Sequence, residues 1–547
     1  MRDSMKRLAI IDLGSNTCRL VIFAFTPDGA FRLTDQVSES VRIGEGMLGQ
    51  SNLQLKPMRR VIELLKMFAA LCRANEIETV IATATSAVRD AANGAEFVER
   101  VARETGLTLR VLTGDEEAYY AYLGAINGVT LANGIIADLG GGSLELTRVQ
   151  NRLLVATASL PLGAVRMTEK FLRGDPIPKS AVRSLTAYVN AQLDAFPWLR
   201  LTRGETLIAL GGTVRALTKV DQRAREYPLE RLHAYELSHA AVSEISDELL
   251  KKDVAARAKI KGLKDERADI IPAGALVIRE LMTHVSAPQL IVSGRGLREG
   301  LLYEYLLREG EELVLRDEGS NVKTSNVILP DVRAFGIANV SCLYEIDWAH
   351  AQQVCQLALM LFDQMRGEHR LGAAERALLL YAACLHDCGV LIDYYRHHHH
   401  SAYLIENADL PGFNHRELAY LALLVRWHRR GEPTLEPYDA LLTKTDLARL
   451  EKLIACLRMA EDLERSRAQL IVTLRVHVRA HDIEIVASTR APAAAELWSA
   501  NRETKLWDRA FGKRVRVVAQ PHAEKVEPAR QETSVQARAA WIVNALK

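Results

Sequence analysis

The sequence predicts an α/β fold made of two related halves, followed by a helical region and a small α/β tail. Two segments carry this prediction: residues 9–17 read Ala-Ile-Ile-Asp-Leu-Gly-Ser-Asn-Thr, and residues 135–143 read Ile-Ile-Ala-Asp-Leu-Gly-Gly-Gly-Ser. Each is an apolar run that ends in an aspartate, turns through small residues and re-enters a strand-like stretch. Backbone N–H groups in such a turn suit phosphate oxygens. Two such hairpins predict two halves that face one phosphate-binding cleft.

The three glycines at 140–142 follow a predicted strand, which is also typical of a dinucleotide-binding site. That fingerprint requires a helix directly after the glycines. The residues that follow here, Leu-Glu-Leu-Thr, favour a strand, so we reject it. A glycine hairpin without chemical function is the alternative for either copy alone. The pair, with its acids placed alike, favours a site.

Strands alternate with helices through both halves. In the first half we expect a helix at 56–74, a strand at 79–82, a helix at 94–104 and a strand at 108–112. In the second half we expect strands at 134–138, 207–210 and 289–292. The last two of these lead into Gly211-Gly212-Thr213 and Gly294-Arg295-Gly296, each followed by a predicted helix. Amides at helix N-termini suit anions.

The remainder of the chain divides by composition. Residues 316–326 form a polar linker, and the pattern from about 330 to 467 is almost wholly helical. From 468 onward, 470–476 and 483–487 alternate like strands. The predicted domains are therefore 1–127, 128–315, 316–467 and 468–547.

Composition limits the class of protein. The 547 residues are 25% charged and 48% hydrophobic, which is typical of a globular protein, and the net charge of +2 leaves a polyanionic partner open. Seven cysteines without a CxxC pair indicate a reducing compartment. Since we find neither a signal peptide nor an apolar span long enough for a bilayer, we expect a cytoplasmic protein without a membrane or nucleic-acid partner.

Three motifs together resemble one known family. They are the two aspartate hairpins and residues 112–118, Leu-Thr-Gly-Asp-Glu-Glu-Ala, which are close to a Ser-Gly-x-Glu-Glu-Ala signature. The chain is similar to the exopolyphosphatase and guanosine pentaphosphate phosphatase family. The resemblance implies duplicated actin-like (ribonuclease H-like) domains of the superfold shared by actin, sugar kinases and heat-shock chaperones. Around Leu385-His386-Asp387-Cys388-Gly389, the helical region resembles an all-α HD-type domain.

The resemblance implies a processive, Mg²⁺-dependent exopolyphosphatase that also accepts guanosine pentaphosphate, and a homodimer. Glu117 aligns with the family's catalytic glutamate, so we assign it as the general base. The alternative to a catalytic role is that Glu116 and Glu117 merely begin a helix, where negative side chains interact favourably with the helix dipole. Two functional alternatives stay open: a dedicated guanosine pentaphosphate phosphatase, and a non-catalytic polyphosphate- or nucleotide-sensing protein. A kinase of the same superfold would also use two hairpins, but Glu-Glu-Ala favours hydrolysis.

Mg²⁺ in proteins is usually bound by oxygen ligands and by the phosphate groups of substrates. We expect Asp138 and Glu145, which flank the second turn, to hold it, with Asp12 as a weaker ligand from the other half. Arg89 is predicted to bind phosphate at the cleft, and an ordinary surface arginine is an equally good interpretation of this residue. The predicted phosphate-binding residues are Gly14, Ser15, Asn16, Arg19, Arg89, Gly140, Gly141, Gly142, Ser143, Gly212 and Thr213.

Nine of the 15 histidines fall between His350 and His428. The HD-type resemblance implies a second metal held by His350, His386, Asp387 and Glu461, the glutamate standing where the pattern has an aspartate. The alternative is ordinary core histidines. We expect this domain mainly to grip the distal polyphosphate, with a solvated basic face as the alternative. The predicted path for the polyanion comprises Arg396, His398, His400, Arg426, His428, Arg429 and Arg430.

Overall fold

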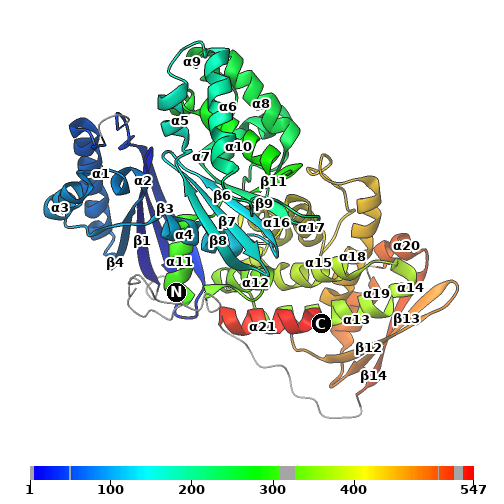
Figure 1. Cartoon of the computed structure of the whole chain (residues 1–547). Coiled ribbons are helices and arrows are strands. Elements are labelled where there is room, and N and C mark those ends of the chain that lie inside the picture. Colours follow the sequence, from blue (N-terminus) through cyan, green and yellow to red (C-terminus); the bar gives the residue numbers. More distant parts are fainter. Residues whose placement is uncertain (1–4, 48–50, 308–326, 503, 523–533) are drawn as a thin grey trace. The chain divides into compact units, whose positions relative to one another are not determined.

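The computed structural model describes residues 5–47, 51–307, 327–502, 504–522 and 534–547 (Figure 1). The chain divides into two compact units. The first comprises Met1–Thr26 and Arg32–Pro330, and the second comprises Pro27–Phe31 and Asp331–Lys547. The predicted linker at 316–326 lies outside the described residues. The finer division into four domains stays a prediction.

The first unit contains two sheets whose strand order repeats. The first sheet has the order β3-β2-β1-β4-β5 and the second β10-β11-β9-β6-β7-β8. In both, the first strand pairs antiparallel with the second and parallel with the strand on its other side. The second sheet therefore matches the first with one added edge strand, as two related halves require. The strands are β1 Lys6–Leu13, β2 Thr17–Phe25, β3 Phe31–Ser40, β4 Thr79–Ala84, β5 Leu109–Val111, β6 Gly134–Leu139, β7 Leu144–Gln150, β8 Leu153–Leu160, β9 Thr206–Gly211, β10 Glu236–Ser238 and β11 Gln289–Val292.

Amphipathic helices cover these sheets. In α1 (Leu55–Ala74) the buried Val61, Leu65 and Phe68 recur every three to four residues, which is the spacing of one helix face. Those side chains belong to the core of the first sheet, while a separate core lies on the second sheet. The other helical segments of this unit are α2 Ser86–Arg89, α3 Gly94–Thr105, α4 Gly114–Ile126, α5 Ala164–Phe171, α6 Lys179–Leu193, α7 Gly212–Ala224, α8 His239–Lys251, α9 Val254–Arg257, η2 Asp265–Arg267, α10 Ile271–His284 and α11 Leu297–Leu307.

Helices α4 and α11 pack against each other inside the first unit (Figure 1). Helix α4 also contacts β6, β7 and β8, and α11 contacts β1, so this pair joins the two sheets. The approach is close because Gly300 has no side chain: a Cβ there would lie 2.0 Å from the carbonyl oxygen of Tyr120. This packing fixes the position of the first turn of α4.

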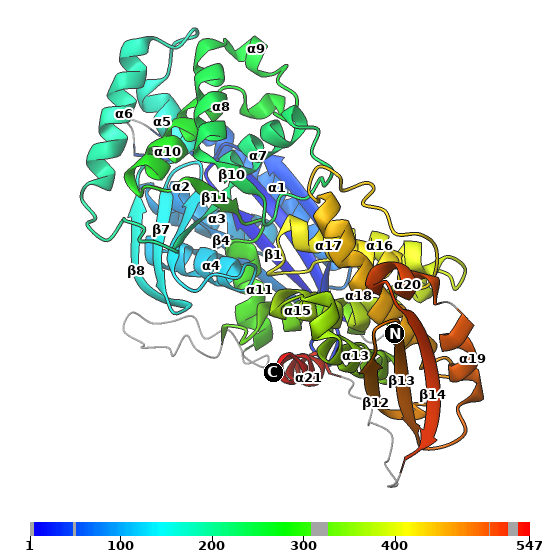
Figure 2. The same ribbon diagram turned by 90° about the vertical axis from the view of Figure 1, so that its right-hand side faces the viewer.

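The second unit is mainly helical and also contains a small sheet (Figure 2). Strands β12 (Ile471–Val478), β13 (Asp482–Thr489) and β14 (Arg514–Pro521) form the sheet in that order. The last helix packs on α12 rather than on this sheet. Among the described residues, none of the helices combines the length and the apolar composition that a membrane span requires. The helical segments are α12 Val332–Leu343, α13 Trp348–Gln364, α14 Arg366–His369, α15 Ala373–Leu385, η4 Cys388–Leu391, α16 His397–Asn407, α17 His415–Arg426, α18 Lys444–Asp462, α19 Ala494–Arg502, α20 Lys505–Phe511 and α21 Val535–Leu546.

Candidate active site

The two aspartate hairpins have the same register. Asp12 lies opposite Arg19 on β1 and β2, and Asp138 lies opposite Glu145 on β6 and β7. Both turns close through the same backbone hydrogen bond, from Gly14 to residue 17 at 3.1 Å and from Gly140 to residue 143 at 3.0 Å. Directly opposite residues of antiparallel strands share one face of a sheet. The first hairpin thus presents a carboxylate with a guanidinium, and the second presents two carboxylates.

Both hairpins line one cavity of about 110 Å³ in the first unit. Three predicted residues lie elsewhere: Gly142 lines a neighbouring cavity, Ser143 is buried and Arg89 contacts Glu117. The predicted residues that line the cavity are Asp12, Gly14, Ser15, Asn16, Arg19, Glu117, Asp138, Gly140, Gly141, Glu145, Gly212 and Thr213.

The two glutamates at the start of α4 have different roles. Glu116 forms a capping box with Thr113, whose side chain accepts from its backbone N–H at 3.2 Å, and it also pairs with Arg110. Glu117 lines the cavity and accepts a hydrogen bond from Arg89 at 2.9 Å. The helix-start interpretation therefore describes Glu116. Glu117 is left free of any capping role.

Burial raises the pKa of Glu117 to about 7, against the opposing effect of Arg89. A carboxylate with this pKa is suited to accept a proton near neutral pH. Burial also raises the pKa of Asp138 to about 6, with a smaller contribution from Asp12. The pKa of Glu145 is raised by burial and by the charge of Glu117. Acids that resist ionisation together in one cavity favour a cation among them.

These acids fit a hard divalent cation, because every donor they offer is a carboxylate oxygen. Glu145 is oriented by Ser159, whose hydroxyl donates to Oε1 at 3.0 Å. Within the described residues, no three of the cavity acids bring oxygens within 4.8 Å of one another. An ion held by Asp138, Glu145 and Asp12 would therefore need water for part of its shell, as Mg²⁺ usually does.

Sequence reasoning missed three arginines of the cavity, Arg215, Arg267 and Arg298, which join Arg19 there. Burial and the nearby Arg19 and Arg298 lower the pKa of Arg215 to about 9. Within the described part of the chain, the buried Nε of Arg215 has no hydrogen-bond partner, and neither has Oδ1 of Asn16. Such a concentration of buried positive charge is suited to a polyanionic phosphate group.

Two of these arginines, Arg215 and Arg298, could have been predicted, because each lies next to a glycine turn at the start of a helix. Arg215 follows Gly212 in the first turn of α7, and Arg298 follows the 294–296 turn at the start of α11. Arg267 had no such signal, because its place in the cavity depends on a contact between distant segments. Its guanidinium lies over Gly212, where a Cβ would come within 2.1 Å. A side chain at residue 212 would therefore displace this guanidinium.

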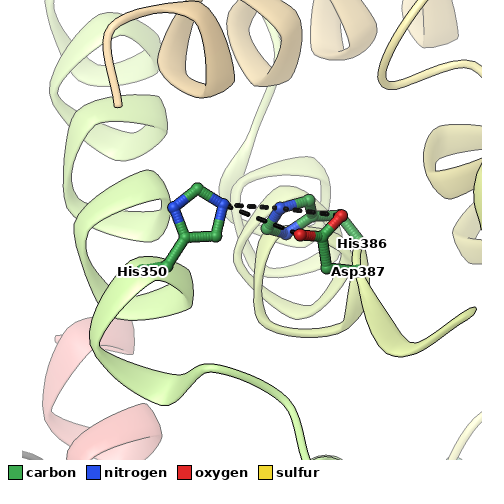
Figure 3. A group of neighbouring side chains, drawn as sticks. All are labelled: His350, His386 and Asp387. Carbon is green, nitrogen blue, oxygen red and sulfur yellow. Dashed lines mark hydrogen bonds and ion pairs between the residues drawn. The ribbon is translucent and has the colours of Figure 1, made fainter. Parts of the chain in front are cut away.

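In the second unit, the four residues implied as a second metal site come together. Figure 3 shows three of them, His350, His386 and Asp387, and Glu461 forms ion pairs with both histidines. The Nε2 atoms of His350 and His386 each lie 3.1 Å from Oε2 of Glu461 and 3.3 Å from each other. Asp387 lies 3.8 Å from His350 and 3.6 Å from His386. Burial lowers the pKa of His386, but Asp387 and Glu461 outweigh it and raise the value to about 9. The carboxylates thus favour a positive charge at this point.

The predicted path for a polyanion needs correction at two histidines. His428 is 1% exposed and faces Asp387, and His398 is 4% exposed. Neither can contact a chain at the surface, because the packing of α16 and α17 covers them. Arg429 is half-buried and donates to the hydroxyl of Tyr394 at 3.0 Å. The remaining predicted residues of the path are Arg396, His400, Arg426 and Arg430, of which Arg396 and Arg430 are exposed.

Comparison with known proteins finds one family over most of the chain. Residues 22–309 match the Ppx/GppA phosphatase family, and residues 332–501 match Ppx/GppA phosphatase, domain III. A guanosine-5'-triphosphate,3'-diphosphate pyrophosphatase of Vibrio cholerae is 28% identical over 84% of this chain and 87% of its own. The enzyme of that name from Vibrio vulnificus is 26% identical over 91% and 96%.

A solved exopolyphosphatase from Cytophaga hutchinsonii is 25% identical and superposes with a TM-score of 0.51. The match covers 55% of this chain and 98% of that one.

Proposed function

Because this chain belongs to the Ppx/GppA phosphatase family, we propose that its cavity hydrolyses the terminal phosphoanhydride bond of inorganic polyphosphate, and also that of guanosine pentaphosphate. The class of reaction, hydrolysis of a phosphoanhydride, is that of the family and of the named relatives. The observation that carries the proposal is Glu117, a buried base with a pKa of about 7 in a cavity that also holds four arginines.

The residues of the cavity suggest how the reaction proceeds. Arg19, Arg215 and Arg298 bind the terminal phosphate, together with backbone N–H groups of the hairpin turns. Glu117 accepts a proton from water as the water oxygen bonds to phosphorus. The bond from that phosphorus to the bridging oxygen breaks, and the shortened chain leaves. The arginines balance the charge on the phosphoryl oxygens, where such reactions need it.

We propose Mg²⁺ as the metal of this site, held by Asp138 and Glu145, with Asp12 as a weaker ligand. The ion would supply positive charge to the phosphate oxygens. What supports it is the donor set: three carboxylates line a cavity that also contains four arginines, and two of these carboxylates have raised pKa values. Hard oxygen donors of this kind are typical of magnesium sites.

The proposal is tested by timing phosphate release from long polyphosphate and from guanosine pentaphosphate, with and without Mg²⁺. We expect release from both substrates, and loss of release when Mg²⁺ is chelated. Release from guanosine pentaphosphate alone would indicate the dedicated phosphatase. If neither substrate releases phosphate, the enzyme proposal is wrong and a binding or sensing role takes its place.

Arg89 provides a test of the base through pH. Its hydrogen bond favours the charged form of Glu117, so Arg89→Met should raise the pKa of Glu117 further. A base works only when deprotonated, so kcat/KM should rise with pH through about 7 in the wild type. In Arg89→Met the acid limb should move upward by ~1–2 pH units, because a charge-assisted hydrogen bond is lost.

The matched control for this pH profile is Arg110→Met, because Arg110 pairs with the capping Glu116 instead. Its acid limb should stay at the wild-type position. An unmoved limb in Arg89→Met would show that Glu117 does not set the pH dependence.

We further propose that the helical region is an HD-type domain that grips the distal chain. The HD-type identity is supported by the meeting of His350, His386, Asp387 and Glu461. The grip is supported by the exposed Arg396 and Arg430.

The grip should depend on salt. Electrostatic contacts to a polyanion weaken as salt rises, by ~0.7–0.9 in log–log slope for each phosphate contact. Arg429→Gln with Arg430→Gln should therefore flatten the slope for long polyphosphate by about one to two, measured by binding titrations from low to high salt, and spare short substrates. The control is Arg514→Gln with Arg516→Gln, an equal loss of charge from exposed positions of β14. Equal slopes in all three proteins would contradict the grip.

We also propose a homodimer in the cytoplasm. The homodimer is proposed from the family resemblance. Light scattering tests it, and we expect twice the chain mass of 60.8 kDa. The compartment is supported by the cysteines, since all seven are free thiols, including Cys355 and Cys384 with sulfur atoms 3.4 Å apart.

A further inference from the structure

Five potential ligands from different segments of the helical unit lie around one carboxylate, Asp387. The residues form two groups that share it. One group is the expected set with His350 and His386, and the other contains His397 and His428. His397 begins α16 and His428 follows α17, so the two are 31 residues apart and no local pattern predicts their contact. Both are buried, at 4% and 1% exposure.

The first group has the dimensions of one face of a coordination shell. Nε2 of His350, Nε2 of His386 and Oε2 of Glu461 form a triangle with sides of 3.1, 3.1 and 3.3 Å. Neighbouring ligand atoms bound to one ion at about 2.1 Å lie about 3.0–3.4 Å apart. The three atoms are therefore spaced as ligands of a single ion.

The second group has a similar spacing. Nε2 of His397 lies 3.3 Å from Nε2 of His428 and 3.3 Å from Oδ1 of Asp387. Nε2 of His428 lies 3.9 Å from the same Oδ1. This set alone offers two imidazole nitrogens and one carboxylate oxygen to a second ion.

Hydrogen bonds fix the orientation of three of these rings. His386, His397 and His428 each donate from Nδ1 to the backbone carbonyl three residues earlier, at 2.7, 2.9 and 2.7 Å. A carbonyl can only accept, so the Nδ1 atoms carry hydrogen, and in a neutral ring Nε2 then has a bare lone pair. Metal-binding histidines are typically held by this kind of contact. Two lone pairs facing each other at 3.3 Å, as in His397 and His428, repel each other unless a proton or a metal ion lies between them.

Asp387 supplies an independent observation. Its Oδ1 is buried and has no hydrogen-bond partner within the described part of the chain, although three histidine Nε2 atoms surround it. A buried carboxylate oxygen without a partner is costly unless it is bound to a cation. Its other oxygen, Oδ2, accepts a hydrogen bond from Arg467 at 2.6 Å, which fixes the plane of the carboxylate.

We infer that the helical unit binds two divalent transition-metal ions bridged by Asp387, one held by His350, His386 and Glu461 and the other by His397 and His428. Four imidazoles with two carboxylates favour ions of the manganese-to-zinc series over Mg²⁺, which prefers oxygen alone. With four and three protein ligands, both ions keep positions for water, as in sites that activate water. This centre is separate from the proposed magnesium site, whose residues all belong to the first unit.

Metal content of the full-length protein tests the inference. The protein is prepared without an affinity tag, stripped with a chelator, reloaded with Mn²⁺ or Co²⁺, dialysed and analysed by mass spectrometry. We expect two tightly bound ions per chain. When the stripped wild-type protein is titrated with Co²⁺, absorbance in the visible range should stop rising at two equivalents. This measurement does not depend on any variant. His397→Ala with His428→Ala should retain one ion.

The control is His399→Ala with His400→Ala, which removes two neighbouring histidines of the same helix that lie outside both groups. It should bind two ions, as the wild type does. Three results would overturn the inference: no retained transition metal in the folded wild type, a single ion, or loss of metal in the His399/His400 variant equal to that in the His397/His428 variant. The last would assign the metal to the histidine run at 397–400 as a surface chelator.

Discussion

Glu117→Gln is expected to lower turnover by ~10²–10⁴-fold while leaving substrate binding largely intact. The amide has the size of the carboxylate and can still accept from Arg89, but it cannot take a proton from water. The loss should therefore appear in kcat rather than in KM. The measurement is steady-state phosphate release from polyphosphate, together with a binding titration of the variant.

Glu116→Gln is the matched control for this experiment. Glutamine can replace glutamate in a capping box, so the start of α4 should be kept. Because Glu116 does not line the cavity, its variant should turn over at nearly the wild-type rate. If Glu117→Gln also keeps its rate, the base must be another acid of the cavity, and Glu145 is the next to be replaced.

Asp138→Asn and Glu145→Gln are expected to raise the Mg²⁺ concentration required for half-maximal activity by ~10–100-fold, in the range found when the support of a metal site is removed. Each change removes one negative oxygen from the hairpin that presents two carboxylates. Excess Mg²⁺ should restore part of the activity, which distinguishes a ligand from a group that acts on water. The measurement is a Mg²⁺ titration of initial rates at saturating substrate.

Asp115→Asn is the control for the metal experiment. Asp115 is an acid of the same first turn of α4, but it accepts from Thr157 and lies outside the cavity. Its Mg²⁺ dependence should match the wild type. An unchanged dependence in both Asp138→Asn and Glu145→Gln would remove these carboxylates from the metal site.

Local pattern was sufficient for most elements. The helix expected at 56–74 is α1 at Leu55–Ala74, and the strand expected at 289–292 is β11 at Gln289–Val292. Both lie within cores whose apolar spacing is visible in the sequence. The hairpins were also predictable, because an aspartate, a glycine turn and a strand are adjacent in the chain.

The composition of the cavity was only partly predictable. Arg267 comes from a short 3₁₀ turn and reaches the cavity through its contact with Gly212. The positive charge opposite the acids therefore depends on segments more than 50 residues apart in sequence, whose meeting no local pattern encodes. Similarly, His428 was expected at the surface, yet helix packing buries it beside Asp387.

The sequence by itself determined the two aspartate hairpins, the alternation of strands and helices, and the Glu-Glu-Ala segment, since each depends on residues that are neighbours in the chain. The tertiary structure decided which glutamate faces the cavity and which histidines face Asp387. Successive residues on a helix point about 100° apart, so Glu116 and Glu117 face different directions, and only Glu117 lines the cavity. Which of them does so is fixed by the packing of α4 against α11 and the second sheet.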